Sequence, residues 1–164
     1  MQTQSKPTTI APIATIFSFN ADFIPMALDG LSLEELWRSP ASHTNPMLWV
    51  AGHIVHTRAT VLQMLGESVD TGWGTLFDRG ATLGEPGQYP SADQVTRTMR
   101  DLSPRLTAAL SALTDEQLNR PSVIGIPGLN TLSDELAFFA LHDSYHVGQL
   151  AYIRKALGYP GLAG

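Results

Sequence analysis

The chain contains no cysteine, few charged residues and no cluster of basic ones. Without cysteine, disulfide bonds, thiolate metal sites and cysteine nucleophiles are all excluded. Charged residues make up 15% of the 164 residues, and the net charge is −5. Nucleic acid is therefore an unfavourable partner, because its binding requires a basic surface.

No segment has the pattern of a targeting or membrane-spanning sequence. Residues 1–17 (MQTQSKPTTIAPIATIF) lack the basic start and following apolar run of a signal peptide. The longest uninterrupted apolar runs, such as LAFFAL, are too short to span a bilayer. We therefore expect a cytoplasmic protein that does not act on a membrane. The length and a hydrophobic content of 43% predict one globular domain over residues 1–164.

Helix-type periodicity and helix-end signals predict four long helices and exclude alternating strands. The first helix is expected over residues 10–29, with Gly30 as its stop and a kink or early end at Pro25. A short helix is expected over residues 32–37. The second long helix is expected to have Asn45 as its N-cap and Pro46 in its first turn, and to end at Gly66.

The second helix should direct one histidine into the core. His53 lies in the middle of the face predicted to be buried, whereas His56 lies on its flank. The other members of this face are Trp49, Val50, Thr57, Thr60 and Met64. The segment 67–90 is rich in glycine and proline, which predicts a long loop of the kind that is often functional.

The last two helices complete the predicted fold. The third begins at Ser91 and has the strongest apolar period in the chain, formed by Val95, Met99, Leu102, Leu106, Leu110 and Leu113. The fourth begins near Thr131 and ends at Gly158, and one of its faces carries Glu135, Phe139, His142, His146, Gln149 and Ile153. We expect an all-α four-helix bundle with a long loop between helices 2 and 3.

The sequence HDSYH places His142 and His146 one helical turn apart, a spacing that lets both bind one metal ion. Such a pair alone is about as often incidental as functional. His53, on the buried face of another helix, favours a metal site, because three unpartnered buried imidazoles would each cost on the order of 1–3 kcal/mol. Three histidines leave a coordination position open, as in catalytic sites. His43, in a loop, and His56 are less favoured ligands.

Asp143 stands where zinc proteases of the H-E-x-x-H type have a glutamate that acts as general base. Aspartate is shorter, and it lies about 100° round the helix from His142. The protease mechanism is therefore disfavoured. We expect Asp143 to be solvated, packed against a neighbouring helix, or hydrogen bonded behind a ligand.

Two segments carry a family resemblance. NPMLWVAGHIVHTR (45–58) and LAFFALHDSYHVGQLAYIRKALG (136–158) resemble the DinB/YfiT-like superfamily of metal-dependent enzymes. The resemblance implies a four-helix bundle, and it implies a metal site formed by His53, His142 and His146. Relatives include thiol-dependent S-transferases and a thiol-dependent maleylpyruvate isomerase. The usual glutamate of the family is replaced here by Asp143.

We expect a metal-dependent enzyme with a divalent ion such as Zn, Ni or Fe and a small-molecule substrate. Transfer of a low-molecular-weight thiol is preferred, since a bound metal lowers the pKa of a thiol and no protein cysteine is needed. One alternative is a metal-dependent hydrolase. A second alternative is a non-enzymatic metal- or ligand-binding bundle, which would be favoured if Asp78 or Glu85 supplied a fourth ligand. Thr57, Thr60 and the loop are candidates for lining the approach.

A homodimer is also expected. Leu136, Ala140 and Tyr152 are predicted to lie outside the histidine face of the fourth helix, and an apolar residue there needs a second partner.

Overall fold

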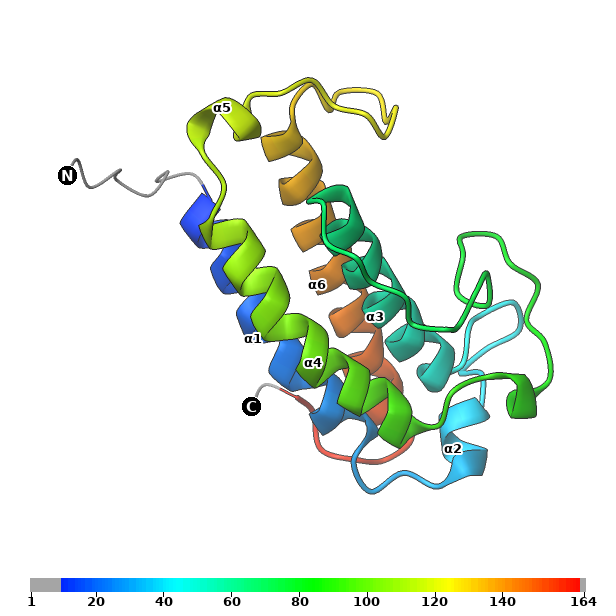
Figure 1. Cartoon of the computed structure of the whole chain (residues 1–164). Coiled ribbons are helices and arrows are strands. Elements are labelled where there is room, and N and C mark those ends of the chain that lie inside the picture. Colours follow the sequence, from blue (N-terminus) through cyan, green and yellow to red (C-terminus); the bar gives the residue numbers. More distant parts are fainter. Residues whose placement is uncertain (1–9, 163–164) are drawn as a thin grey trace.

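The computed structural model describes residues 10–162, which form four long helices and three short ones (Figure 1). Residues 1–9, part of the segment in which no signal peptide is expected, lie outside the described residues. The long helices are α1 (Ile10–Leu28), α3 (Met47–Met64), α4 (Ala92–Ser111) and α6 (Leu132–Ala156). The short ones are α2 (Leu33–Trp37), the 3-10 turn η1 (Pro86–Gln88) and α5 (Asp115–Leu118). The predicted all-α four-helix bundle is confirmed.

The helices are not arranged in their chain order. α1 packs against α4 and α6, and α3 packs against the same two helices, so α1 and α3 occupy opposite corners of the bundle. The long loop between α3 and α4 returns along the bundle, so that these two helices run in the same direction (Figure 1). The connection through α5 stays at the end of the bundle where α4 finishes, and α6 therefore runs antiparallel to both (Figure 1). This order brings α3 beside α6, the two helices that carry the predicted ligands.

Most predicted helix ends are correct. Ser91 and Thr131 each form a capping box with the residue three positions on, and they start α4 and α6. Gly66 and Gly158 have φ values of 93° and 90°, and these left-handed conformations end α3 and α6. Asn45 is not the N-cap of α3 as predicted. The extended Pro46 occupies that position without a side-chain cap, and the helix begins at Met47.

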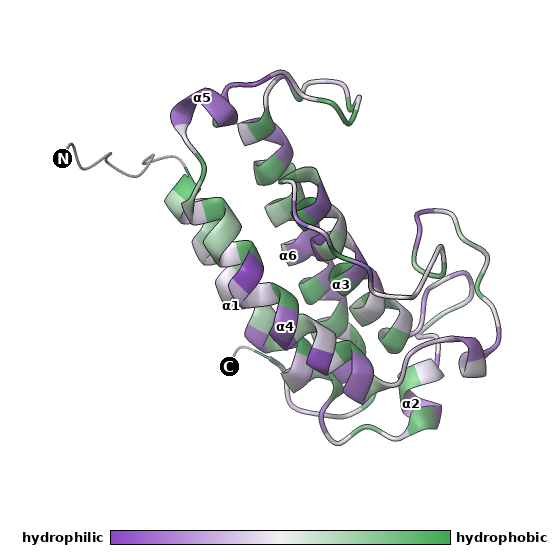
Figure 2. Ribbon diagram, viewed as in Figure 1, coloured by the Kyte–Doolittle hydropathy of each residue, from purple (hydrophilic) through white to green (hydrophobic). Residues whose placement is uncertain are grey.

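The apolar period predicted for the third long helix points into the core, and all six of its residues are buried, including Leu113 just beyond the end of α4. Hydrophilic colours lie on the outward side of this helix (Figure 2). Pro25 does not end α1 early, because the helix continues to Leu28.

The expectation that no segment is long and apolar enough to span a membrane does not hold for α1. By length and composition alone it is long and apolar enough to do so, with a mean hydropathy of 1.3 over its apolar window. Its apolar residues are interspersed with small and polar ones, so no uninterrupted run revealed this. The core helix of a soluble protein passes the same test, and α1 contributes Phe17 and Ile24 to the bundle core.

The reason given for a dimer is partly wrong. Leu136 and Ala140 are buried within the single chain, with 0% and 1% of their surface exposed. α6 contacts α1 on one side and α3 on another, and it therefore needs two apolar sides in the monomer. Tyr152 is 72% exposed, as expected.

Candidate metal centre

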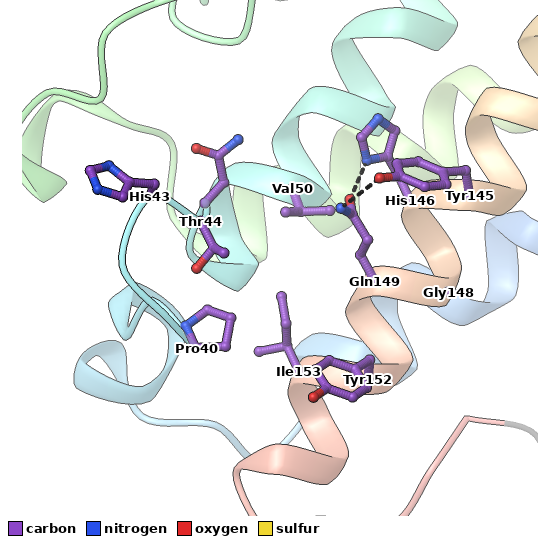
Figure 3. A pocket seen from close by; sticks show the side chains of 11 residues that line it. Pro40, His43, Thr44, Val50, Tyr145, His146, Gly148, Gln149, Tyr152 and Ile153 are labelled. Carbon is purple, nitrogen blue, oxygen red and sulfur yellow. Dashed lines mark hydrogen bonds between the residues drawn. The ribbon is translucent and has the colours of Figure 1, made fainter.

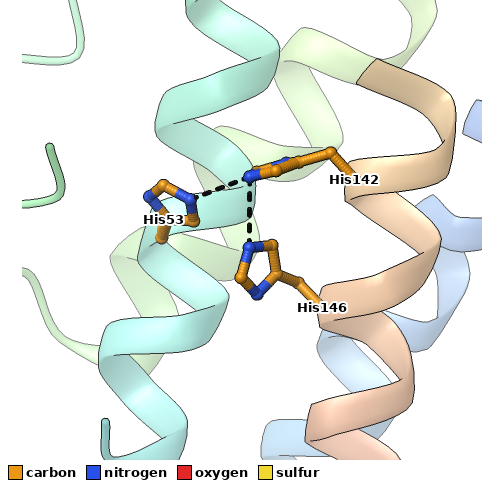
Figure 4. Close-up of side chains that lie close together, drawn as sticks. All are labelled: His53, His142 and His146. Atoms are coloured by element: carbon orange, nitrogen blue, oxygen red, sulfur yellow. Dashed lines mark hydrogen bonds between the residues drawn. The ribbon is translucent and has the colours of Figure 1, made fainter. Parts of the chain in front are cut away.

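His53, His142 and His146 converge between α3 and α6 (Figure 4). The Nε2 atom of His142 lies 3.2 Å from that of His53 and 3.1 Å from that of His146. One ring nitrogen from each residue lies within 4.8 Å of the others. The convergence follows from helix geometry, because His142 and His146 are one turn apart on α6 and His53 lies on the facing side of α3.

In two of the rings, the hydrogen-bond partner of Nδ1 determines which nitrogen carries the proton. Nδ1 of His53 lies 2.6 Å from the carbonyl oxygen of Phe77, which can only accept, so this nitrogen is protonated. Nδ1 of His146 lies 2.6 Å from Oε1 of Gln149 and donates in the same way. Both Nε2 atoms therefore present lone pairs toward the centre, as in metal sites whose ligands are oriented by an outer hydrogen bond.

His142 is held between these two lone pairs and has no partner for its own Nδ1. Its Nε2 atom could donate a proton to only one of the two neighbouring nitrogens. A third lone pair directed at a shared cation would instead satisfy all three nitrogens. The donor set thus fits a divalent metal that accepts imidazole, such as Zn, Ni or Fe.

All three imidazoles are held in the neutral form that metal ligation requires. Burial, followed by the neighbouring His146 and His53 rings, lowers the pKa of His142 to about 4. Burial also lowers the pKa of His53 and of His146, although their hydrogen bonds to Phe77 and Gln149 act in the opposite direction. The cluster therefore stays uncharged near neutral pH.

The long loop is attached directly to His53. Phe77 is fully buried, and its ring occupies the space beside Gly52, where a Cβ atom would lie only 2.2 Å from the ring. The indole of Trp49 stacks on His53 at 5.0 Å between centroids and donates to the carbonyl of Leu76. The rings of Trp73 and Tyr89 pack against that of Phe77, with centroid distances of 5.3 and 5.5 Å. The role of Gly52 was missed, although a glycine next to a candidate ligand in a helix is a recognisable signal.

Asp143 is not solvated. It is 2% exposed and forms a two-point ion pair with the 1% exposed Arg58, at 2.9 Å from both Nε and Nη2. Arg58 also donates to Ser103 and to the carbonyl of Phe17, so one guanidinium links α3 to the other three long helices. Asp143 thus packs toward neighbouring helices and holds α6 in register next to the ligand His142. Arg58 was missed, because nothing near it in the sequence indicates burial.

Glu135 organises a second loop over the site. Its Oε1 accepts hydrogen bonds from the hydroxyl of Ser122 and from the backbone of Val123 and Ile124. Burial raises the pKa of Glu135, but these bonds outweigh it and keep the pKa below its ordinary value. The carboxylate therefore holds the loop that carries Ile124 and Ile126 beside the histidines. The sequence placed Glu135 on the histidine face without assigning it a role.

His56 and the loop carboxylates do not join the cluster. Nε2 of His56 lies 3.0 Å from Oδ1 of Asp78, so Asp78 has another partner. Glu85 starts the η1 turn through its capping box with Gln88. Within residues 10–162, no fourth ligating side chain completes the group of three histidines.

Of the two threonines predicted to line the approach to the metal site, only one does so. Thr57 lines the site as expected. Thr60 does not, because its exposed hydroxyl donates to the carbonyl of His56. His43, in a left-handed conformation with φ 63°, lies in a neighbouring cavity and not among the three converging rings.

Two cavities meet at His146. The larger, of about 710 Å³, contains all three imidazoles together with Asn45, Trp49, Thr57, Arg79, Gly80, Ile124, Ile126, Phe138, Phe139 and Tyr145. The second, of about 540 Å³, lies between the 40–45 segment and α6 and has polar groups from Thr44, Asn45 and Gln149 (Figure 3). Asn45, Tyr145 and His146 line both cavities.

The sequence model of the DinB superfamily matches residues 19–150. The chain belongs to this superfamily. The match includes His53, His142 and His146, and it confirms the resemblance seen in the sequence. None of the curated proteins compared with the chain matches it significantly.

Solved structures of other proteins share the fold. One is YfiT from Bacillus subtilis, described as a probable metal-dependent hydrolase with an unusual four-helix bundle topology. It superposes with a TM-score of 0.72 at 14% identity, covering 97% of this chain and 93% of YfiT. A conserved protein from Enterococcus faecalis superposes with a TM-score of 0.74 at 15% identity, covering 94% of this chain and 99% of that one. At these identities the similarity concerns the fold alone.

Proposed function

We propose that this DinB-superfamily protein is a metal-dependent enzyme in which His53, His142 and His146 hold a divalent metal ion. The observation that carries the proposal is the meeting of three imidazole nitrogens at the wall of a cavity of about 710 Å³. Three ligands leave a position for a reactant, as in catalytic metal sites. YfiT, described as a probable metal-dependent hydrolase, supports the general class.

When bound, the metal would act as a Lewis acid and lower the pKa of a thiol or a water molecule. The chain supplies the remaining requirements. The carbonyl of Phe77 and the amide of Gln149 hold two imidazoles with their lone pairs inward. Phe138 and Phe139 contribute apolar walls that reduce water access and strengthen the electrostatic interactions inside.

We propose transfer of a low-molecular-weight thiol as the specific chemistry. The thiol loses its proton to solvent, its sulfur forms a bond to an electrophilic carbon, and the group leaving that carbon departs with the bonding electron pair. Two cavities that share Asn45, Tyr145 and His146 support this choice, because they provide space for two organic molecules at one centre. The reaction requires no cysteine from the protein, and the chain has none.

Hydrolysis by the same centre is the second candidate, favoured by the description of YfiT. A bundle that only binds a metal or ligand is less favoured, because no fourth side chain closes the group of histidines within the described residues.

The test combines a thiol-dependent and a thiol-independent assay on zinc-loaded protein. Conjugation of 1-chloro-2,4-dinitrobenzene is measured with cysteine, glutathione, bacillithiol and mycothiol, and release of nitrophenol from 4-nitrophenyl acetate is measured without thiol. We expect conjugation with at least one thiol, abolished by a chelator and by His142→Ala. Thiol-independent ester cleavage with the same sensitivities would establish the hydrolase instead. Stoichiometric zinc without either activity would contradict thiol transfer to this electrophile and favour a binding role.

A further inference from the structure

Arg79 lies at the corner of a tight turn next to the candidate metal centre. The turn comprises residues 78–81 and is closed by a hydrogen bond of 3.0 Å from the backbone of Ala81 to that of Asp78. Gly80 has a φ of 82°, the left-handed conformation that a turn of type II requires at its third position. Arg79 therefore occupies the second position of the turn, from which its side chain lines the larger cavity.

This turn is attached to α3 at three points. The ring of Phe77 fills the space beside Gly52, and its carbonyl accepts the hydrogen bond from His53. The carboxylate of Asp78 is 3.0 Å from His56, one helical turn after His53. The backbone that carries Arg79 is thus held relative to the three histidines, although the loop has little regular structure.

The guanidinium of Arg79 has no ion-pair partner among residues 10–162. The carboxylate of the preceding residue, Asp78, is already paired with His56. Arg79 is also the only residue lining the cavity with a fixed charge, since the other polar groups are histidines, Asn45, Thr57 and Tyr145. Most of the remaining lining is aromatic or branched aliphatic.

We propose that Arg79 is a specificity residue that binds a carboxylate on the substrate, and that the substrate is an acid with an aromatic or branched apolar body. The inference rests on the proposed function, because it identifies the molecule that would react at that centre. A guanidinium presents two parallel donors that match a carboxylate, and a single fixed cation suits a single negative charge. The apolar body would contact Phe138, Phe139 and Ile126, with its reactive carbon directed toward the histidines.

Binding of two probes of nearly equal shape tests this assignment. Phenylacetate carries the carboxylate, and phenylacetamide is its neutral counterpart. Calorimetric titrations use the full chain, wild type and variants, both loaded with zinc and stripped by a chelator. The variants are Arg79→Gln, Arg79→Lys and the control Arg97→Gln, which removes an equal charge from an exposed position on α4 outside the cavity.

We expect wild type and Arg97→Gln to prefer phenylacetate over phenylacetamide by roughly tenfold or more, as hydrogen bonds to a charged group allow. Arg79→Gln should lose this preference, and Arg79→Lys should retain part of it. The preference should persist, more weakly, in protein without zinc, because Arg79 is then the only fixed cation in the cavity. Retention of the full preference in Arg79→Gln would overturn the proposal, as would failure of wild type to bind phenylacetate at millimolar concentration.

The zinc content and the effect of Arg79→Gln together distinguish this inference from the metal proposal. If the protein binds one zinc ion per chain and Arg79→Gln leaves the preference for phenylacetate unchanged, the carboxylate site is overturned and the metal centre remains intact. An Arg79-dependent preference in a protein that fails to bind zinc would support the carboxylate site and overturn the metal centre.

Discussion

Arg58 and Asp143, 85 positions apart in the sequence, form a two-point ion pair in the centre of the bundle, with both N–O distances 2.9 Å. Both side chains are almost fully buried. Asp143 directly follows the candidate ligand His142, so the pair fixes the part of α6 from which that ligand projects. The acidic residue that resembles a catalytic base in the sequence is therefore a positioning residue in the structure.

Asp143→Ala should destabilise the protein by about 3–5 kcal/mol, because Arg58 would be left as a buried and unpaired cation. Denaturant unfolding of the metal-free protein measures this effect. The double variant Arg58→Met with Asp143→Ala should recover much of the loss, since it removes both charges. A double variant no more stable than Asp143→Ala would contradict the ion-pair explanation.

Gly52→Ala tests the attachment of the long loop. A Cβ atom would lie 2.2 Å from the ring of Phe77, so this ring must move, and the hydrogen bond between its carbonyl and His53 should weaken. We expect a loss of about 1–3 kcal/mol and weaker zinc binding. Gly148→Ala is the matched control, because a Cβ there meets nothing within 4 Å. It should be neutral or stabilising by about 1 kcal/mol. Equal effects of the two substitutions would reject the role of Gly52.

The stability of the metal-free protein should depend on pH through the histidines. Burial holds the pKa of His142 near 4 and lowers those of His53 and His146, whereas an unfolded chain titrates near the ordinary value of 6.5. Below pH 6.5 the unfolded state binds more protons than the folded state, so stability falls with acid down to about pH 4. It should be independent of these groups above pH 7. His142→Ala should reduce the slope of the melting temperature in this interval, and an unchanged slope would contradict the assignment.

Much of the fold follows from local signals in the sequence. The period of α4 and the starts of α4 and α6 at Ser91 and Thr131 depend on neighbours within one turn, and each was predicted correctly. The convergence of the histidines could also be predicted, because a helical face determines which residues point inward. The N-cap of α3 was predicted one residue too early, at Asn45 instead of Pro46, since a proline suits either side of a helix start.

The remaining parts depend on contacts between distant segments. The burial of Arg58, the hydrogen bond from His53 to the Phe77 carbonyl and the loop held by Glu135 all join residues that no periodicity relates. Leu136 and Ala140 were assigned to an outer face because the sequence does not reveal that α6 packs between α1 and α3.

We propose that the protein forms a homodimer through exposed apolar residues on α6 and α1. Leu141, Tyr145 and Tyr152 of α6 and Phe19 of α1 are each more than 60% exposed. Burying such side chains against a second copy would be favourable, at about 25 cal/mol per Å² of apolar surface. Light scattering at micromolar concentration should give about twice the 17.7 kDa of one chain. Tyr152→Asp with Leu141→Asp should give monomers, and a wild-type mass of 17.7 kDa would reject the dimer.

The central claim is that three histidines hold one metal ion, and metal analysis tests it most directly. Wild type, His53→Ala, His142→Ala and the control His56→Ala are purified without a nickel column, dialysed against zinc and measured by inductively coupled plasma mass spectrometry. Wild type and His56→Ala should each contain one ion per chain, whereas His53→Ala and His142→Ala should contain almost none, since two imidazoles bind a metal weakly. Stoichiometric metal in His142→Ala, or none in wild type, would contradict the account.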